Sequence, residues 1–251
     1  MCRSRAWAGL AAAVVGFVVT APLAVADDTL TPSEDWKFVV VPYLWATGID
    51  GDTTVRGVTV PVDVSFSDIV DDLDFAALVH FEAGKGSWGF FVDTTYMDLT
   101  GDFATTLATG SANAQIALVE AAGFKRWGSD RRAVDFLFGT RLWSMDASIN
   151  PDGILPTLEG SQSWADAMAG VRVLCNPWDR WLFVFRTDLA AGGSDPSYNA
   201  SLVFNYLFEK LVSIDFGYRY LDEDYETGQG TDQFALDAAL DGPLVGVGFR
   251  W

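Results

Sequence analysis

The sequence contains few cysteine, histidine and basic residues. Its 251 residues include 2 cysteines and 1 histidine. Cys2 falls in an N-terminal segment that we expect to be removed, so Cys175 would stand alone and no internal disulfide could form. Any histidine-based catalysis would have to use His80. Acidic residues outnumber basic ones by 34 to 16, for a formal net charge of −18, which argues against nucleic acid as a partner.

Long apolar runs are also missing after the N-terminus. The chain starts with a basic stretch, residues 6–25 carry no charge, and an Ala-x-Ala site at residues 24–26 precedes Asp27. This order predicts a cleaved signal peptide over residues 1–26, and the early Pro22 favours cleavage over a membrane-spanning helix. No later stretch is long enough to span a bilayer as a helix. Residues 27–251 are therefore expected to form one domain, which could cross a membrane only as a closed barrel.

The last ten residues alternate between two kinds of side chain. One face of this strand is apolar or aromatic, and it consists of Pro243, Val245, Val247, Phe249 and Trp251. The other face is mostly small, and it consists of Gly242, Leu244, Gly246, Gly248 and Arg250. Such alternation is typical of a transmembrane β-strand, although a soluble β-sandwich can also end on one. The spacing of Gly246, Phe249 and Trp251 resembles the C-terminal insertion signal of bacterial outer-membrane proteins.

Similar alternation continues along the rest of the chain. It predicts ten strands, at residues 36–46, 75–84, 88–99, 112–126, 133–148, 163–175, 181–191, 197–208, 211–221 and 233–251. Short turns and longer loops alternate between them. An even strand count with this asymmetry predicts an all-β fold, an antiparallel up-and-down transmembrane barrel with short periplasmic turns and long extracellular loops. Eight or twelve strands remain possible, because residues 53–65 read as a further hairpin, which we assign to an extension above the membrane.

The faces without aromatic residues carry charges of both signs. We expect them to line the lumen: Glu82, Asp93, Asp135, Arg141, Arg172, Arg186, Asp188, Asp215, Arg219 and Arg250. A ten-stranded barrel leaves a narrow or filled interior, in which buried charges must pair. Strand 112–126 is ambiguous, since Glu120 and Lys125 have opposite parity, and a β-bulge would reconcile them.

Tryptophan is concentrated at one end of the predicted strands. Six of the nine tryptophans after residue 26 fall at the proposed periplasmic rim, namely Trp36, Trp88, Trp127, Trp178, Trp181 and Trp251. Packing in a soluble core gives no reason for this common level. It predicts an aromatic girdle at a membrane surface.

The segment between the first two strands is acidic. Its aspartates are Asp50, Asp52, Asp68, Asp71, Asp72 and Asp74. Their density suits Ca²⁺ or Mg²⁺, although the spacing fits no EF-hand and a solvated acidic loop is the alternative. Residues 67–73 could form a short helix with Ser67 as its N-cap and an apolar stripe of Ile69, Val70 and Leu73. Such a helix could cap the mouth of the barrel.

Several stretches resemble a known family. Residues 42–51 (PYLWATGIDG), 62–75 (VDVSFSDIVDDLDF) and 217–221 (GYRYL), with the Gly242-Pro243 opening of the last strand, are similar to an uncharacterised family of bacterial outer-membrane β-barrel proteins. The resemblance covers essentially all of residues 27–251. The family has no assigned activity, so the resemblance implies fold and location and transfers no catalytic residue.

These observations predict a monomeric barrel in the outer membrane of a Gram-negative bacterium. Its partners would be outer-membrane lipid and, during insertion, the barrel-assembly machinery, with divalent cations at the acidic loops and no cofactor. The function we expect is structural, or that of a narrow, porin-like gated pore with a loop-capped, charge-lined lumen. The alternative is a membrane-embedded hydrolase or acyltransferase. His80 shares a face with Leu78 and Glu82 near mid-strand, where it would more readily join a lumen ion pair than meet a substrate.

Overall fold

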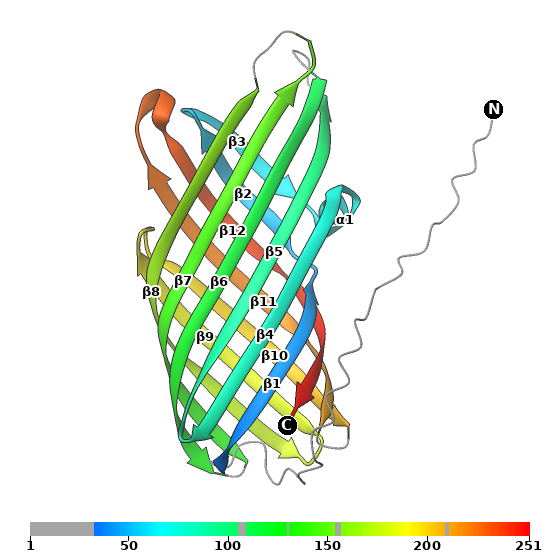
Figure 1. Cartoon of the computed structure of the whole chain (residues 1–251), viewed down its shortest axis with the longest axis vertical. Coiled ribbons are helices and arrows are strands. Elements are labelled where there is room, and N and C mark those ends of the chain that lie inside the picture. Colours follow the sequence, from blue (N-terminus) through cyan, green and yellow to red (C-terminus); the bar gives the residue numbers. More distant parts are fainter. Residues whose placement is uncertain (1–32, 105–108, 130, 154–156, 209–210) are drawn as a thin grey trace, which may run out of the picture.

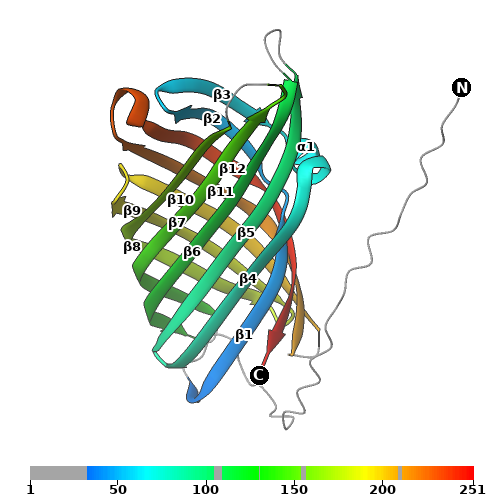
Figure 2. The same cartoon turned by 45° about the horizontal axis from the view of Figure 1, so that its top comes forward.

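The computed structural model describes residues 33–104, 109–129, 131–153, 157–208 and 211–251, so the predicted signal peptide lies outside the described residues. It is an antiparallel barrel with its strands tilted against the long axis (Figures 1 and 2). The strands are β1 (Ser33–Trp45), β2 (Gly48–Val55), β3 (Val58–Val64), β4 (Leu73–Gly86), β5 (Trp88–Ala104), β6 (Thr109–Ser129), β7 (Arg132–Pro151), β8 (Leu158–Trp178), β9 (Trp181–Gly192), β10 (Ser197–Phe208), β11 (Val212–Thr227) and β12 (Phe234–Arg250). The helices are α1 (Phe66–Asp72) and a short 3-10 turn, η1 (Gly230–Asp232).

Ten of these strands close the barrel. β1 pairs with β4, β4 to β12 pair in chain order, and β12 returns to β1 with Val40 opposite Phe249 and Tyr43 opposite Gly246. The predicted pairing of the first and last strands is therefore confirmed, as is the ten-stranded antiparallel barrel. The connections at the lower end in Figure 1 are short turns, whereas β5 to β8 project far beyond the upper end.

The hairpin β2–β3 is a continuation of the barrel wall. β12 is long enough to pair twice, with β2 through Phe234–Asp241 and with β1 through its second half. Arg56 and Gly57 both have positive φ values, 53° and 75°, as a two-residue type I′ turn requires. The hairpin predicted at residues 53–65 is present, but it begins earlier, at Gly48, and it prolongs the barrel wall. β3 pairs with β2, and α1 then leads the chain back to β4.

The helix α1 begins earlier than predicted. Its N-cap is Ser65, not Ser67, because Ser65 has the extended backbone of an N-cap and shares a capping box with Asp68. Hydrogen bonds from the Ser65 hydroxyl and backbone N–H hold the pKa of Asp68 below its usual value. Ile69 is buried, while the side chain of Val70 lies outside the described residues. No described helix is long and apolar enough to cross a membrane.

The predicted direction of the side chains is confirmed in β11. Ile214, Phe216 and Tyr218 are exposed on the outside, whereas Asp215 and Arg219 are buried inside. The bulge predicted in strand 112–126 is wrong, because β6 pairs with β5 and β7 without a register shift. Glu120 points inward, and Lys125 simply points outward, with its ammonium 4.3 Å from the centre of the Trp88 ring. A long lysine side chain can do this because its charged end reaches the polar boundary.

Candidate functional site in the barrel lumen

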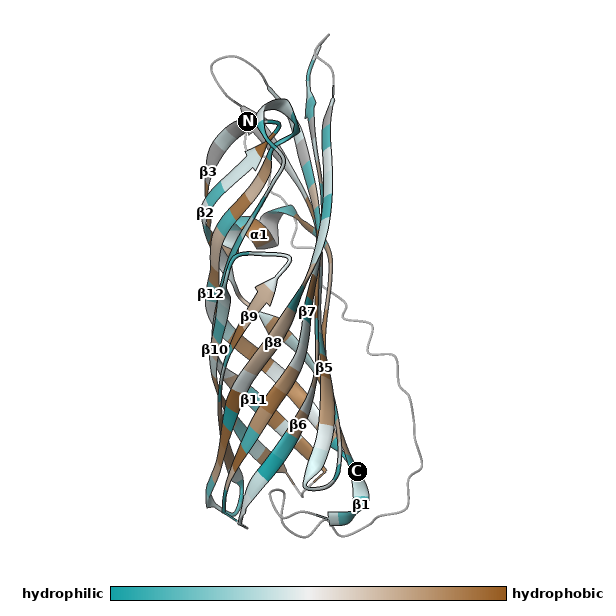
Figure 3. Cartoon of the chain, turned by 90° about the vertical axis from the view of Figure 1, so that its left-hand side faces the viewer, coloured by the Kyte–Doolittle hydropathy of each residue, from teal (hydrophilic) through white to brown (hydrophobic). Residues whose placement is uncertain are grey.

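The outer surface of the barrel is apolar. Its exposed large side chains include Phe90, Phe136, Phe138, Val173, Phe185, Leu189, Leu202, Phe216, Val245 and Val247. In Figure 3 apolar stretches predominate on the strands below α1. The tryptophans assigned to a girdle, Trp36, Trp88, Trp127, Trp178 and Trp251, are each at least half exposed and lie next to the short turns or at the ends of β1 and β12. Trp181 is partly covered by Tyr206 and Phe183.

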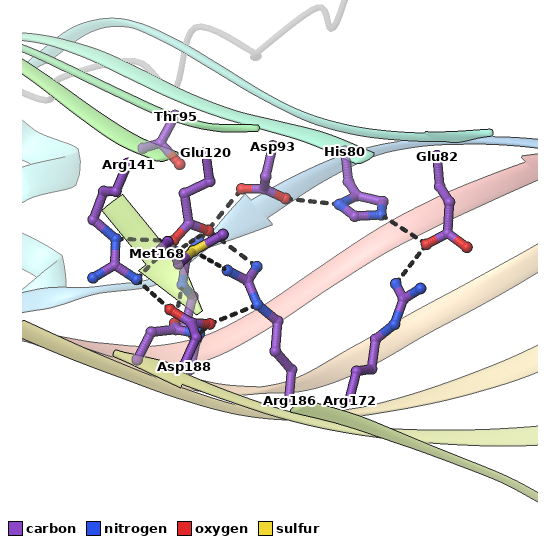
Figure 4. Close-up of polar contacts among 12 residues, drawn as sticks. His80, Glu82, Asp93, Thr95, Glu120, Arg141, Met168, Arg172, Arg186 and Asp188 are labelled. Atoms are coloured by element: carbon purple, nitrogen blue, oxygen red, sulfur yellow. Dashed lines mark hydrogen bonds and ion pairs between the residues drawn. The ribbon is translucent and has the colours of Figure 1, made fainter. Parts of the chain in front are cut away.

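The lumen contains a network of ion pairs around one carboxylate. Glu120 on β6 is fully buried, and Arg141, Arg186 and Arg219 donate to it over 2.8–3.0 Å. Arg219 comes from β11, which lies halfway round the barrel from β6 in the strand order. The contact between Glu120 and Arg219 therefore spans the lumen. Figure 4 shows the carboxylate of Glu120 with Arg141 and Arg186 beside it.

The rest of the network extends from Glu120 in two directions. Arg141 also donates to Asp188 over 2.6 Å. Toward the short-turn end, Asp135 accepts from Arg126 over 2.7 Å and from Arg172 over 2.7 Å. We call the following ten residues the ion-pair network: Glu82, Asp93, Glu120, Asp135, Asp188, Arg126, Arg141, Arg172, Arg186 and Arg219. Five acids face five arginines, so the network is internally neutral.

Of the ten predicted lumen charges, the structure brings eight into this network. The other two, Asp215 and Arg250, lie nearer the short-turn end. Arg250 donates to the neutral partners Ser213 and Asn205, over 2.5 and 2.9 Å. Asp215 is buried, and its Oδ1 atom has no hydrogen-bond partner among the described residues. The expectation that all lumen charges pair is therefore not met at this level of the barrel.

His80 joins the network between two acids. Its Nδ1 atom lies 3.0 Å from Asp93, and its Nε2 atom lies 3.8 Å from Glu82. Phe91 stacks on the ring at 5.5 Å. Among the described residues, no hydrogen bond joins His80 to a serine, threonine or cysteine. Because both ring nitrogens face carboxylates, the geometry suits an ion-pair partner better than a general base acting on a substrate.

A second layer of side chains lies in the lumen beyond the network, toward the long-loop end. We call it the outer apolar cluster: Trp45, Leu78, Met97, Ile116, Leu118, Trp143, Trp164, Leu221, Tyr225, Phe234, Leu236, Ala238 and Leu240. The rings of Trp143, Trp164 and Tyr225 are stacked at 5.7 and 4.1 Å. Trp45 meets the network directly, since the Arg219 guanidinium lies 4.9 Å from its ring.

The first loop contributes to this cluster from its hairpin. Ile49 and Val55 of β2 pack against the outer apolar cluster. A Cβ added to Gly160 on β8 would lie 3.7 Å from Val55, so the hairpin leans toward the opposite wall. The helix α1 contacts β2 of this hairpin and the neighbouring part of β5. The prediction gave the capping role to the helix, whereas in the structure Ile49 and Val55 of the hairpin pack against the outer apolar cluster and α1 contacts β2 and β5.

The acidic residues of the first loop do not converge in this structure. Among the described residues, no three His, Cys, Asp or Glu side chains form a group that could hold a metal ion. Asp68 is engaged by Ser65, and the side chain of Asp71 lies outside the described residues. Divalent-cation binding at this loop stays a prediction.

A closed antiparallel barrel with an apolar outside, a tryptophan girdle and a polar interior fits only one environment. In a bilayer every backbone group of the wall must be paired within the protein, which closure achieves. These features define an outer-membrane β-barrel protein of a Gram-negative bacterium. The short-turn end with both barrel termini is its periplasmic end.

Comparisons with known proteins find structural neighbours of low sequence identity. No protein-family model and no curated protein matches the sequence. Among solved structures, the translocator domain of the autotransporter NalP from Neisseria meningitidis is 12% identical, with a TM-score of 0.45 over 88% of this chain and 91% of that chain. The outer membrane protease OmpT from Escherichia coli is 7% identical, with a TM-score of 0.45 over 89% and 99%. OprG from Pseudomonas aeruginosa is 9% identical, with a TM-score of 0.40 over 89% and 99%. Similarity this low carries no information on function.

The location has a direct check. After cell fractionation the protein should sediment with the outer membrane, and its mobility in a detergent gel should shift on heating, because a closed hydrogen-bonded barrel resists unfolding by detergent until it is heated. Recovery in the soluble periplasmic fraction would contradict the membrane assignment.

Proposed function

We propose that this protein is a structural outer-membrane barrel whose lumen is sealed, with no open pore in the resting state. The observation that supports this most strongly is the bond between Glu120 and Arg219, 3.0 Å long, which joins opposite walls at mid-lumen. Both side chains are buried, Glu120 completely. A water-filled channel through this level would have to displace Glu120 together with the three arginines that it holds.

The outer apolar cluster forms a second seal in series with the first. Its stacked rings present apolar surface in the lumen, and ions avoid apolar surroundings at a cost of several kcal/mol. A gated pore would need both layers to move. The protein is therefore better described as a plugged barrel than as a gated channel.

Conductance in planar bilayers tests this proposal. The intact protein should give no current above the bare membrane. Removing residues 52–73 takes away the hairpin and α1 but leaves the ion-pair network, so that variant should also stay silent. Trp143→Ala and Trp164→Ala break the outer apolar cluster, and Glu120→Ser with Arg219→Ser breaks the contact across the lumen. Only the deletion variant that carries all four substitutions should conduct.

Each variant must first show a heat-shifted gel band, which reports a folded barrel. Steady current through the intact protein would overturn the proposal. Current through the deletion variant alone would show that the first loop is a lid over an open pore.

A further inference from the structure

A cavity of about 280 Å³ lies in the periplasmic half of the lumen, below the ion-pair network. Its lining extends from Ser33, Lys85 and Trp251 at the rim to His80 and Arg172 at the inner end. Figure 4 shows His80 and Arg172 joined through Glu82 at that inner end. The cavity is therefore a blind pocket that is closed by the network and open toward the periplasm. A structural barrel has no evident need for it.

One side of the pocket is aliphatic. Its side chains come from β1, β8, β9 and β10, and they are Val39, Val41, Leu174, Leu182, Val184 and Val203. Leu174 and Leu182 are packed into a buried cluster, so this wall is firm. Pockets that bind small molecules are mostly apolar with a few placed polar groups. A wall of this kind suits an alkyl chain.

The rim of the pocket is basic, although the whole chain is strongly acidic. Lys37, Lys85 and Arg250 line it, together with one acid, Asp215. The other acids in the lining, Glu82 and Asp93, are already engaged by the network. Arg250 donates to two neutral partners and forms no ion pair among the described residues, so its charge can serve a ligand.

We propose that this pocket binds a single-chain amphiphile with an anionic head, which enters from the periplasmic side. The head lies at Arg250, and the alkyl chain lies along the valine and leucine wall toward His80. A carboxylate or phosphate head suits an arginine through charge-assisted hydrogen bonds. This binding function goes beyond a sealed barrel and does not depend on whether the barrel conducts.

Asp215 allows a test in which the direction of the change in affinity shows the charge of the ligand's head. A Cβ added to Gly248 would lie 3.2 Å from the Asp215 carboxylate and 3.3 Å from the Arg250 guanidinium, so the two groups are neighbours. The Asp215 charge should therefore repel an anionic head and attract a cationic one. Neutralising it should strengthen binding of an anion, which is the opposite of what removing a ligand contact normally does.

The experiment uses the full barrel in phosphatidylcholine nanodiscs and three probes with the same eight-carbon chain, octanoate, octylammonium and octyl glucoside. Calorimetric titration, corrected with empty nanodiscs, should show one octanoate bound per chain, about tenfold more tightly than octylammonium. Arg250→Gln should weaken octanoate about tenfold because a charge-assisted bond is lost. Asp215→Asn should strengthen it several-fold, and Val203→Trp should abolish it by filling the cavity.

Lys125→Gln is the matched control, because Lys125 carries the same charge at the same rim but faces outward over Trp88. It should leave octanoate binding unchanged. A heat-shifted gel band confirms that each variant is folded; Arg250→Met and Val184→Trp replace any variant that is not. Octanoate uptake that survives the filled cavity, equal binding of octylammonium, or weaker octanoate binding in Asp215→Asn would each overturn the proposal.

Discussion

Replacing Glu120 by Ala should destabilise the barrel by about 3–5 kcal/mol, because it leaves an uncompensated charge in the buried interior. The side chain is fully buried and holds Arg141, Arg186 and Arg219 together. Without it these three guanidinium groups retain their mutual repulsion and lose their shared acceptor. The measurement is equilibrium unfolding in urea, with the barrel folded into phospholipid vesicles.

Glu159 provides the matched control. It is also a glutamate on a strand, but it lies at the start of β8, at the long-loop end, and its side chain is exposed. Glu159→Ala should change the free energy of unfolding by no more than about 0.5 kcal/mol. Equal small effects from the two substitutions would mean that the ion-pair network contributes little to stability.

Trp251→Asp, or deletion of residues 249–251, should reduce the amount of folded protein in the outer membrane about tenfold or more. The backbone of Trp251 exchanges two hydrogen bonds with Phe38, of 2.9 and 3.2 Å, and their rings stack at 5.7 Å. These contacts lie at the seam where β12 meets β1. Deletion leaves backbone groups of β1 at this seam without the partners that residues 249–251 provide. The measurement is the heat-shifted fraction in isolated membranes.

Trp127→Asp tests whether Trp251 acts by closing the barrel between β1 and β12 or only by anchoring the rim at the membrane surface. Trp127 lies at the same rim and is similarly exposed, 55% against 50%, but it belongs to β6, away from the seam. It should reduce the folded fraction far less than Trp251→Asp. Equal losses would show that Trp251 acts as one girdle residue among several and that the resemblance to an insertion signal has no special weight here.

The barrel could be predicted from the sequence because its strands are long and alternate strictly. Period two decides which side chains face lipid, and short polar turns decide which strands are neighbours. The same argument placed Asp215 and Arg219 inside. It failed at Lys125, where parity conflicted with Glu120, because a lysine near a membrane boundary can point outward without a bulge.

The contents of the lumen were harder to predict. Six tryptophans were assigned to the rim, and the other three after residue 26, Trp45, Trp143 and Trp164, come together in the outer apolar cluster. Their inward parity was visible, since Trp143 has the same parity as Arg141 and Asp135 and therefore shares their face of the strand. Contact among the three tryptophans could not be predicted, because it depends on how far each strand is staggered around the barrel. Charge balance likewise could not show that Glu120 is the centre of the network, or that Arg250 takes neutral partners.

The claim at the centre of this account is that Glu120 and Arg219 bind each other across the lumen. A double-mutant cycle measures this interaction directly, with Glu120→Ala, Arg219→Ala and the double variant compared by urea unfolding in vesicles. Residues that share a buried network should show a coupling energy of about 1–3 kcal/mol. Effects that add to within about 0.5 kcal/mol would show that the two side chains are independent and that the lumen is not closed at this level.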